Sequence, residues 1–157
     1  MQRIHTAALA LTAAIAFFVG GWASFAPASF FDSFPGVLGQ WVSTDGPYNE
    51  HLVRDVGAMY LALGAASVAG LAWRSPAVTR VLGLAWTVFG TLHLWYHATH
   101  LDHLTTDAAI GTVVSLTLSL GLGILLLIPA RASRRPETDA TGLTDAAGTA
   151  AHEEVTR

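Results

Sequence analysis

The chain lacks cysteine and lysine, and it carries few charges of either sign. Without cysteine, the 157 residues can form no disulfide, no thiolate metal site and no cysteine nucleophile. Charged residues make up only 12% of the chain and hydrophobic residues make up 52%. A soluble domain typically carries about 25% charged residues, so the composition excludes an ordinary soluble globule. It also excludes a disordered chain, and the net charge of −3 points away from nucleic acid.

Four apolar segments are each long enough to cross a membrane, which takes about 20 residues of helix. They predict helices at about 7–25, 53–73, 77–97 and 108–129. The predicted fold is all-α: an integral membrane four-helix antiparallel bundle, formed as one transmembrane domain by residues 1–130. Residues 131–157 are rich in Ala, Thr, Asp and Glu and contain no aromatic residue, so we expect a disordered cytoplasmic tail.

The arginines predict the orientation of the bundle. If the chain crosses four times, Arg3, the Arg74–Arg80 turn and the arginines that follow residue 129 all lie on one side. Positive residues favour the cytoplasmic side, so we expect a multi-pass protein of the bacterial inner membrane with both termini in the cytoplasm. Residues 1–28 also resemble a signal peptide with an Ala26-Pro27-Ala28 cleavage site, and its cleavage would leave three spans facing the same way.

Small residues at four-residue spacing predict how the helices pack. Such residues let two helix backbones approach closely in a membrane, within one bundle or between two copies of a chain. The second segment carries Ala58, Ala62, Ala66 and Gly70; the fourth carries Gly111, Ser115, Ser119 and Gly123; the third carries Gly83 and Gly90. At the helix starts, Asn49 and Thr106 are the predicted caps of the second and fourth helices.

The predicted outward loop, residues 26–52, is rich in aromatic residues. It contains Phe30, Phe31, Phe34, Trp41 and Tyr48 among prolines and glycines. So many aromatic side chains are costly in a mobile aqueous loop, and we expect this extracytoplasmic loop to fold over the outer mouth of the bundle. A short interfacial helix is predicted around residues 29–41.

Histidines gather at the predicted outer ends of the second and third helices. His93, His97 and His100 fall within an arc of about 60° on a helix, and His103 lies about 60° beyond it if the helix continues. His51 and Asp55 are four residues apart at the start of the second helix. If the two helices are neighbours, these runs face each other. The candidate metal ligands are His51, Asp55, His93, His97 and His100, and the candidate secondary polar pocket is Glu50, Arg54, Asp102 and His103.

Imidazole and carboxylate groups in this pattern favour a divalent metal, zinc or iron. Haem held by His51 with His93 or His97 is a less favoured alternative. The histidines could also serve only as interfacial polar packing, or as a substrate or proton site. We find no serine-nucleophile, phosphate-loop or dinucleotide motif, and no catalytic residue is identified.

Residues 34–64 and the run HLWYHATHLDHL at 93–104 resemble a group of small uncharacterised bacterial membrane proteins, DoxX-like in overall plan. The resemblance covers about residues 5–130. It implies four helices and a pairing of the Asn49–Gly57 segment with the histidine-rich helix end. DoxX-like proteins have been linked to quinone-side or redox-accessory roles, but the resemblance implies no settled activity and assigns no residue.

These observations lead to one functional hypothesis and two alternatives. The hypothesis is a small membrane protein with an outward-facing His/Asp/Glu pocket that binds a divalent metal or a small polar ligand, as an accessory to a larger membrane system. The first alternative is a purely structural or interaction subunit. The second is a membrane redox or acid–base enzyme that uses a His–Asp pair. The expected partners are the lipid bilayer and a membrane protein or second copy, with no nucleic acid.

Overall fold

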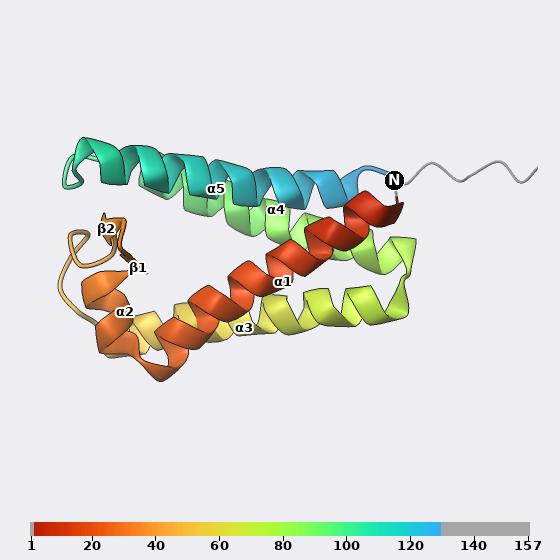
Figure 1. The fold of residues 1–157 in the computed structure, drawn as a ribbon, viewed down its shortest axis with the longest axis horizontal. Helices are drawn as coiled ribbons and strands as arrows, with labels where there is room; N and C mark the ends of the chain where they lie inside the picture. Colours follow the sequence, from red (N-terminus) through yellow and green to blue (C-terminus); the bar gives the residue numbers. More distant parts are fainter. Residues whose placement is uncertain (1, 130–157) are drawn as a thin grey trace, which may run out of the picture.

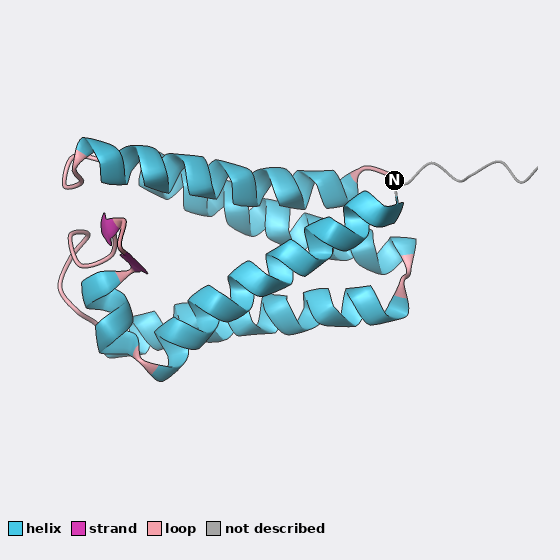
Figure 2. Cartoon of the chain, viewed as in Figure 1, coloured by secondary structure: helices cyan, strands magenta, loops and turns pink. Residues whose placement is uncertain are grey.

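The computed structural model describes residues 2–129, which form five helices and two very short strands (Figure 2). The elements in chain order are α1 (Gln2–Phe25), α2 (Pro27–Ser33), β1 (Pro35–Gly36), β2 (Gly39–Gln40), α3 (Glu50–Trp73), α4 (Pro76–Ala98) and α5 (Thr106–Leu127). The all-α prediction is confirmed, with one antiparallel pair of two-residue strands in the loop after α2. The predicted tail, residues 131–157, lies outside the described residues.

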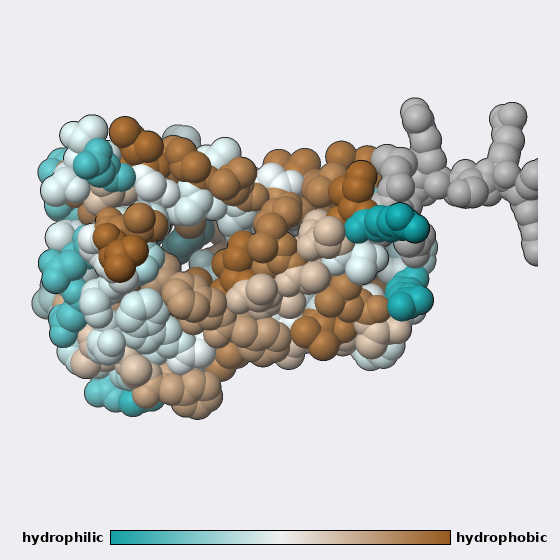
Figure 3. All heavy atoms as spheres, in the orientation of Figure 1, coloured by the Kyte–Doolittle hydropathy of each residue, from teal (hydrophilic) through white to brown (hydrophobic). Residues whose placement is uncertain are grey.

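Four of the helices, α1, α3, α4 and α5, are long and apolar enough to cross a membrane. Their outer faces carry many exposed large apolar side chains. Soluble proteins rarely expose a contiguous apolar surface of this kind to water. Figure 3 shows the apolar residues in a band across the middle of the molecule and hydrophilic residues mainly at its two ends. The fold is that of a multi-pass membrane protein whose helices contact lipid.

The four long helices form two tightly packed pairs, α1 with α3 and α4 with α5 (Figure 1). The predicted adjacency of α3 and α4 is only partly right, because these two helices are joined by a short turn but share few contacts along their length. The turn, residues 74–75, lies near the start of α1 and the end of α5, and we call this the arginine end after Arg3, Arg74 and Arg80. The opposite end, formed by residues 26–49 and 99–105, is called the loop end.

Glycines bring α1 and α3 into backbone contact. A methyl group at Gly20 would lie 2.8 Å from the Gly57 carbonyl oxygen, and one at Gly57 would lie 2.6 Å from the Ser24 amide nitrogen. Gly64 packs in the same way on Ala16. The predicted ladder on α3 is only half right: Ala58 and Ala62 are exposed, whereas Ala66 packs against the core and Gly70 packs against Leu82 and Leu9.

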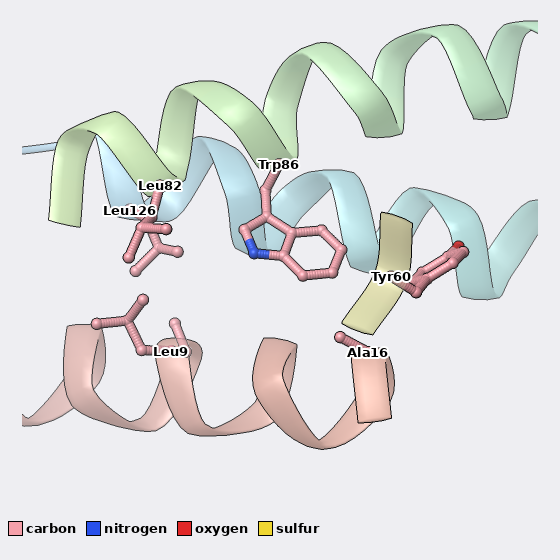
Figure 4. Packing of buried hydrophobic residues seen from close by; sticks show 7 residues of the cluster. Leu9, Ala16, Tyr60, Leu82, Trp86 and Leu126 are labelled. Atoms are coloured by element: carbon pink, nitrogen blue, oxygen red, sulfur yellow. The ribbon is translucent and has the colours of Figure 1, made fainter. Parts of the chain in front are cut away.

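The pairing of α4 with α5 follows the predicted small residues more closely. Gly83 packs on the backbone at Leu126, and Gly123 packs on the backbone between Trp86 and Thr87. The two pairs meet around Trp86, whose buried indole donates a hydrogen bond of 3.1 Å to Ser67 Oγ of α3. Figure 4 shows Leu9 of α1 approaching Leu82, Trp86 and Leu126 across this core.

Caps and the proline-rich loop define the ends of the elements. Asn49 caps α3 as predicted, with its Oδ1 accepting a hydrogen bond from Leu52 N at 3.1 Å. Thr105, and not Thr106, caps α5 through a 3.4 Å contact from Ala108 N. The predicted interfacial helix is shorter than 29–41: α2 ends at Ser33 because Phe34, which precedes a proline, is extended with ψ 136°.

A neighbouring pair of glycines in α1 tests the α1–α3 contact. We expect Gly20→Ala to lower the free energy of unfolding by about 1–2 kcal/mol, because the added methyl group meets the α3 backbone. Gly21→Ala is the matched control, since its methyl group meets nothing within 4 Å, and it should raise stability by up to about 1 kcal/mol through helix propensity. Thermal unfolding in detergent measures both, and equal stability of the two variants would contradict this packing.

Candidate functional site

A cavity of about 440 Å³ lies between the two helix pairs at the loop end. We call it the loop-end cavity. All four long helices contribute to its lining, together with α2 and the loop that follows it. Its lining residues fall into two walls of different chemistry.

The first wall, built by α1, the loop and α3, is mainly apolar and aromatic. It includes Phe18, Phe30, Phe34, Trp41, Val53 and Tyr60. The rings contact one another: Phe30 and Phe34 lie 4.6 Å apart between centroids, and Trp41 meets the Phe34 ring edge-on at 6.1 Å. These contacts join α2 and the following loop into one packed surface.

The second wall, built by α4 and α5, supplies most of the polar groups. They are His93, His97, Thr112, Ser115 and Ser119. The three hydroxyl-bearing residues lie on one stripe of α5, because they are three or four residues apart. The small size of these residues leaves room for the cavity, and their hydroxyls give this wall hydrogen-bonding capacity.

His93 and His97 are held by a ladder of rings along α4. The His93 ring stacks on Phe89 with centroids 5.0 Å apart, and the His97 ring meets His93 edge-on at 4.8 Å. Phe89 in turn packs against Tyr60 of α3 at 5.1 Å. Both histidines are partly buried and line the cavity, so each can present ring nitrogens to a bound molecule.

Two polar atoms of cavity-lining residues have no hydrogen-bond partner among residues 2–129. They are the Thr112 hydroxyl oxygen and the Trp41 indole nitrogen. Thr112 is only 3% exposed. A buried polar group without a partner costs about 1–3 kcal/mol, so these two atoms are a local cost of the packing around the cavity.

The loop covers the cavity and is attached to the α4–α5 side. The Trp41 ring lies directly on Gly111, where a methyl group would come within 2.7 Å of the ring. The Asp45 carboxylate accepts a hydrogen bond of 3.4 Å from the Tyr96 hydroxyl and lies 3.7 Å from His103 Nε2. The prediction that the loop folds over the mouth of the bundle is therefore confirmed.

The α3 part of the predicted site lies outside the cavity. His51 Nε2 and Asp55 Oδ2 are 3.3 Å apart, and the side chains are 87% and 62% exposed. Glu50 forms an exposed ion pair of 2.8 Å with Arg54, whose guanidinium also donates to the Ser24 carbonyl oxygen. The cause is the rotation of α3 about its axis: α3 contributes Leu52, Val53, Val56 and Tyr60 to the cavity, which directs residues 50, 51, 54 and 55 elsewhere.

The remaining predicted ligands separate because α4 ends at Ala98. His100 lies beyond the helix, where its Nδ1 donates a 2.8 Å hydrogen bond to the Tyr96 carbonyl oxygen and its ring stacks on Tyr96. Asp102 is exposed, and His103 is directed to Asp45. Residues 2–129 contain no group of three or more His, Asp or Glu side chains that could hold a metal ion, so the five predicted ligands do not form one site.

Sequence reasoning missed two residues of this region. Asp45 is not among the predicted site residues, although its position in a Thr-Asp-Gly-Pro turn is typical of a carboxylate that stabilises a loop. Thr112 follows the predicted ladder residue Gly111, and its burial could not be seen from helix packing patterns alone. Ser115 and Ser119 were identified as packing residues, whereas the structure places them at the cavity.

Comparison of the chain with protein-family models, with curated proteins and with solved structures finds no match. The resemblance to DoxX-like proteins stays a prediction.

The attachment of the loop through Asp45 can be tested by hydrogen–deuterium exchange. We expect Asp45→Ala to raise backbone exchange over residues 35–48 about fivefold, because the loop loses its contacts with Tyr96 and His103, worth about 1 kcal/mol. Asp32→Ala is the control, since this exposed aspartate lies in the same region but away from Tyr96 and His103. Equal exchange in the two variants would show that other contacts hold the loop.

Proposed function

We propose that the protein binds a small, uncharged, amphiphilic molecule in the loop-end cavity, at the outer side of the bacterial inner membrane. The observation that carries this proposal is the pairing of an aromatic wall with a hydroxyl and imidazole wall around one cavity. Ligand sites typically have volumes of about 300–1,000 Å³, mainly apolar linings and a few polar groups that orient the ligand. A cavity of about 440 Å³ falls within that range.

The polar groups favour a ligand with hydroxyl or carbonyl oxygens. His93 and His97 can each donate or accept a hydrogen bond, and Ser115 and Ser119 add hydroxyl groups to the cavity lining. Among the described residues, no arginine lines the cavity and Asp45 is its single carboxylate. A strongly anionic ligand would therefore find no arginine to neutralise it, and the one carboxylate that a cation could use already lies beside Tyr96 and His103.

The distribution of charge supports the proposed orientation. The six carboxylates of residues 2–129 belong to α2, α3, the start of α5 and the loops of the loop end, while Arg3, Arg74 and Arg80 surround the opposite end. The positive-inside rule then assigns the arginine end to the cytoplasm, with both chain termini. The loop-end cavity would open toward the outer leaflet, where an amphiphile can enter from lipid.

A second candidate function is that of an accessory subunit that binds a partner membrane protein or a second copy. The exposed residues Ala58 and Ala62 favour it, because this small-residue face of α3 is not used within the bundle. Lipid contact alone also accounts for exposed alanines, so the cavity remains the stronger basis for a function.

The absence of cysteine makes the orientation directly testable. We expect Thr44→Cys, at the loop end, to react with a membrane-impermeant maleimide added outside intact spheroplasts. Ala77→Cys, at the arginine end, should react only after the membrane is permeabilised. Both positions are exposed, and the unchanged chain is a cysteine-free control. Labelling of Ala77→Cys from outside would reverse the proposed orientation.

Ligand binding can be tested by filling the cavity. The probe is N-phenyl-1-naphthylamine, a neutral two-ring amphiphile, and binding is read as energy transfer from tryptophan in nanodiscs. We expect saturable transfer with the unchanged protein, because Trp41 lines the cavity. Ser119→Phe should weaken binding by at least about tenfold, or roughly 1.4 kcal/mol, because the new ring occupies the cavity.

Leu118→Phe is the matched control, because the same ring is added at the next residue of α5, which is 65% exposed. It should leave probe binding unchanged. Equal binding by the two variants would contradict the proposed site. Elemental analysis of the same samples addresses the metal hypothesis: stoichiometric zinc or iron that is lost in His97→Ala would favour a metal site instead.

A further inference from the structure

A second cavity, of about 640 Å³, lies at the arginine end. It is bordered by the start of α1, the turn between α3 and α4, the first turns of α4 and the end of α5. His5 anchors α1 here through a 3.2 Å hydrogen bond between its Nε2 and the Leu125 carbonyl oxygen of α5. This contact keeps the neighbouring residue Arg3 beside the cavity.

Three arginines from separate parts of the chain line this cavity: Arg3, Arg74 and Arg80. None of them forms an ion pair with a carboxylate of residues 2–129. The carboxylates of that range all lie in the elements and loops of the loop end or in the first turns of the helices that begin there. The structure therefore places three positive side chains around one cavity, and none of the carboxylates among residues 2–129 forms an ion pair with them.

The arrangement is costly in two respects. Like charges around one space repel one another, an effect that water reduces here because all three arginines are exposed. In addition, Arg74 ends α3 in the left-handed region with φ 50°, a conformation usually taken by glycine at this position. An anion in the cavity would offset the repulsion and account for a guanidinium at a position that favours glycine.

The rest of the lining is apolar and includes Leu9, Leu71, Leu126 and Ile128. These side chains come from the ends of helices that span the membrane, so the arginines lie at the depth of lipid headgroups. We propose that the cavity binds a phosphate group, and the apolar lining favours a phosphate carried by an anionic lipid over free phosphate. Guanidinium groups match phosphate through paired, charge-assisted hydrogen bonds.

The experiment compares two lipids and free phosphate. The full-length protein is reconstituted in equal amounts of phosphatidylglycerol and phosphatidylcholine with the same acyl chains, and retained lipids are counted by native mass spectrometry. In a separate arm, inorganic phosphate is titrated against the protein in detergent and the melting temperature is followed. We expect preferential retention of phosphatidylglycerol and little response to inorganic phosphate.

Substitution of the arginines should remove the preference. We expect Arg74→Gln and Arg80→Gln each to lower the preference for phosphatidylglycerol by about tenfold, because a hydrogen bond to a charged group is worth about that factor. Arg54→Gln is the charge-matched control at the opposite end and should retain the preference. Arg74→Gly separates binding from folding: it should keep or raise the melting temperature while weakening lipid retention.

Each outcome bears on the proposal. Phosphatidylglycerol retention that is lost in the Arg74 and Arg80 variants supports the lipid source, and inorganic phosphate stabilisation that is lost in the same variants supports a soluble phosphate. Equal retention of the two lipids without a phosphate response overturns the proposal. A preference that survives in Arg74→Gly and Arg80→Gln also overturns it, because it would come from general surface charge.

Discussion

The close approach of α1 and α3 is the constraint on which the rest of the structure depends. Gly20 and Gly57 allow the two backbones to touch, and Gly64 packs on the Ala16 side chain. A larger residue at Gly20 or Gly57 would displace one of the helices. In lipid, where apolar side chains gain little by leaving their surroundings, such backbone contact is a main source of helix association. α3 packs on α1 through backbone contact, whereas it meets α4 mainly through side chains such as Ser67 and Tyr60 on Trp86. The long helices therefore group into two pairs.

The division into pairs explains why the cavities exist. The pairs are held at a set distance near the middle by Trp86, which packs on Tyr60 and donates to Ser67. Toward the loop end the pairs are bridged by the loop and not by direct helix packing, and small residues such as Ser115 and Ser119 on α5 leave space there. A single, evenly packed four-helix core would have filled this space with side chains.

Hydropathy alone was sufficient to predict the four spans and the end at which each loop lies, because membrane thickness imposes the helix length. The rotation of each helix about its axis was not predictable in the same way. Two faces of α3 carry small residues, Ala58 and Ala62 on one and Gly57 and Gly64 on the other. Their spacing does not decide which face packs on α1. Because α3 packs on α1 through Gly57, His51 and Asp55 lie outside the cavity that His93 lines, and the predicted metal ligands are separated. The end of α4 at Ala98 had the same effect on His100.

The histidines of α4 and those that follow it have different surroundings. His93 and His97 contact other rings of α4 and line the loop-end cavity. His100 and His103 lie beyond the helix end, where His100 donates to the Tyr96 carbonyl oxygen and His103 Nε2 lies 3.7 Å from Asp45. His93 and His97 are therefore available to a ligand, while His100 and His103 help to hold residues 99–105 and the loop over the cavity in place. The loop over the cavity contacts the α4–α5 pair through Asp45 and Trp41, and it follows α2, which packs on α1 and α3. This loop therefore connects the two helix pairs at the end where they do not pack directly on each other.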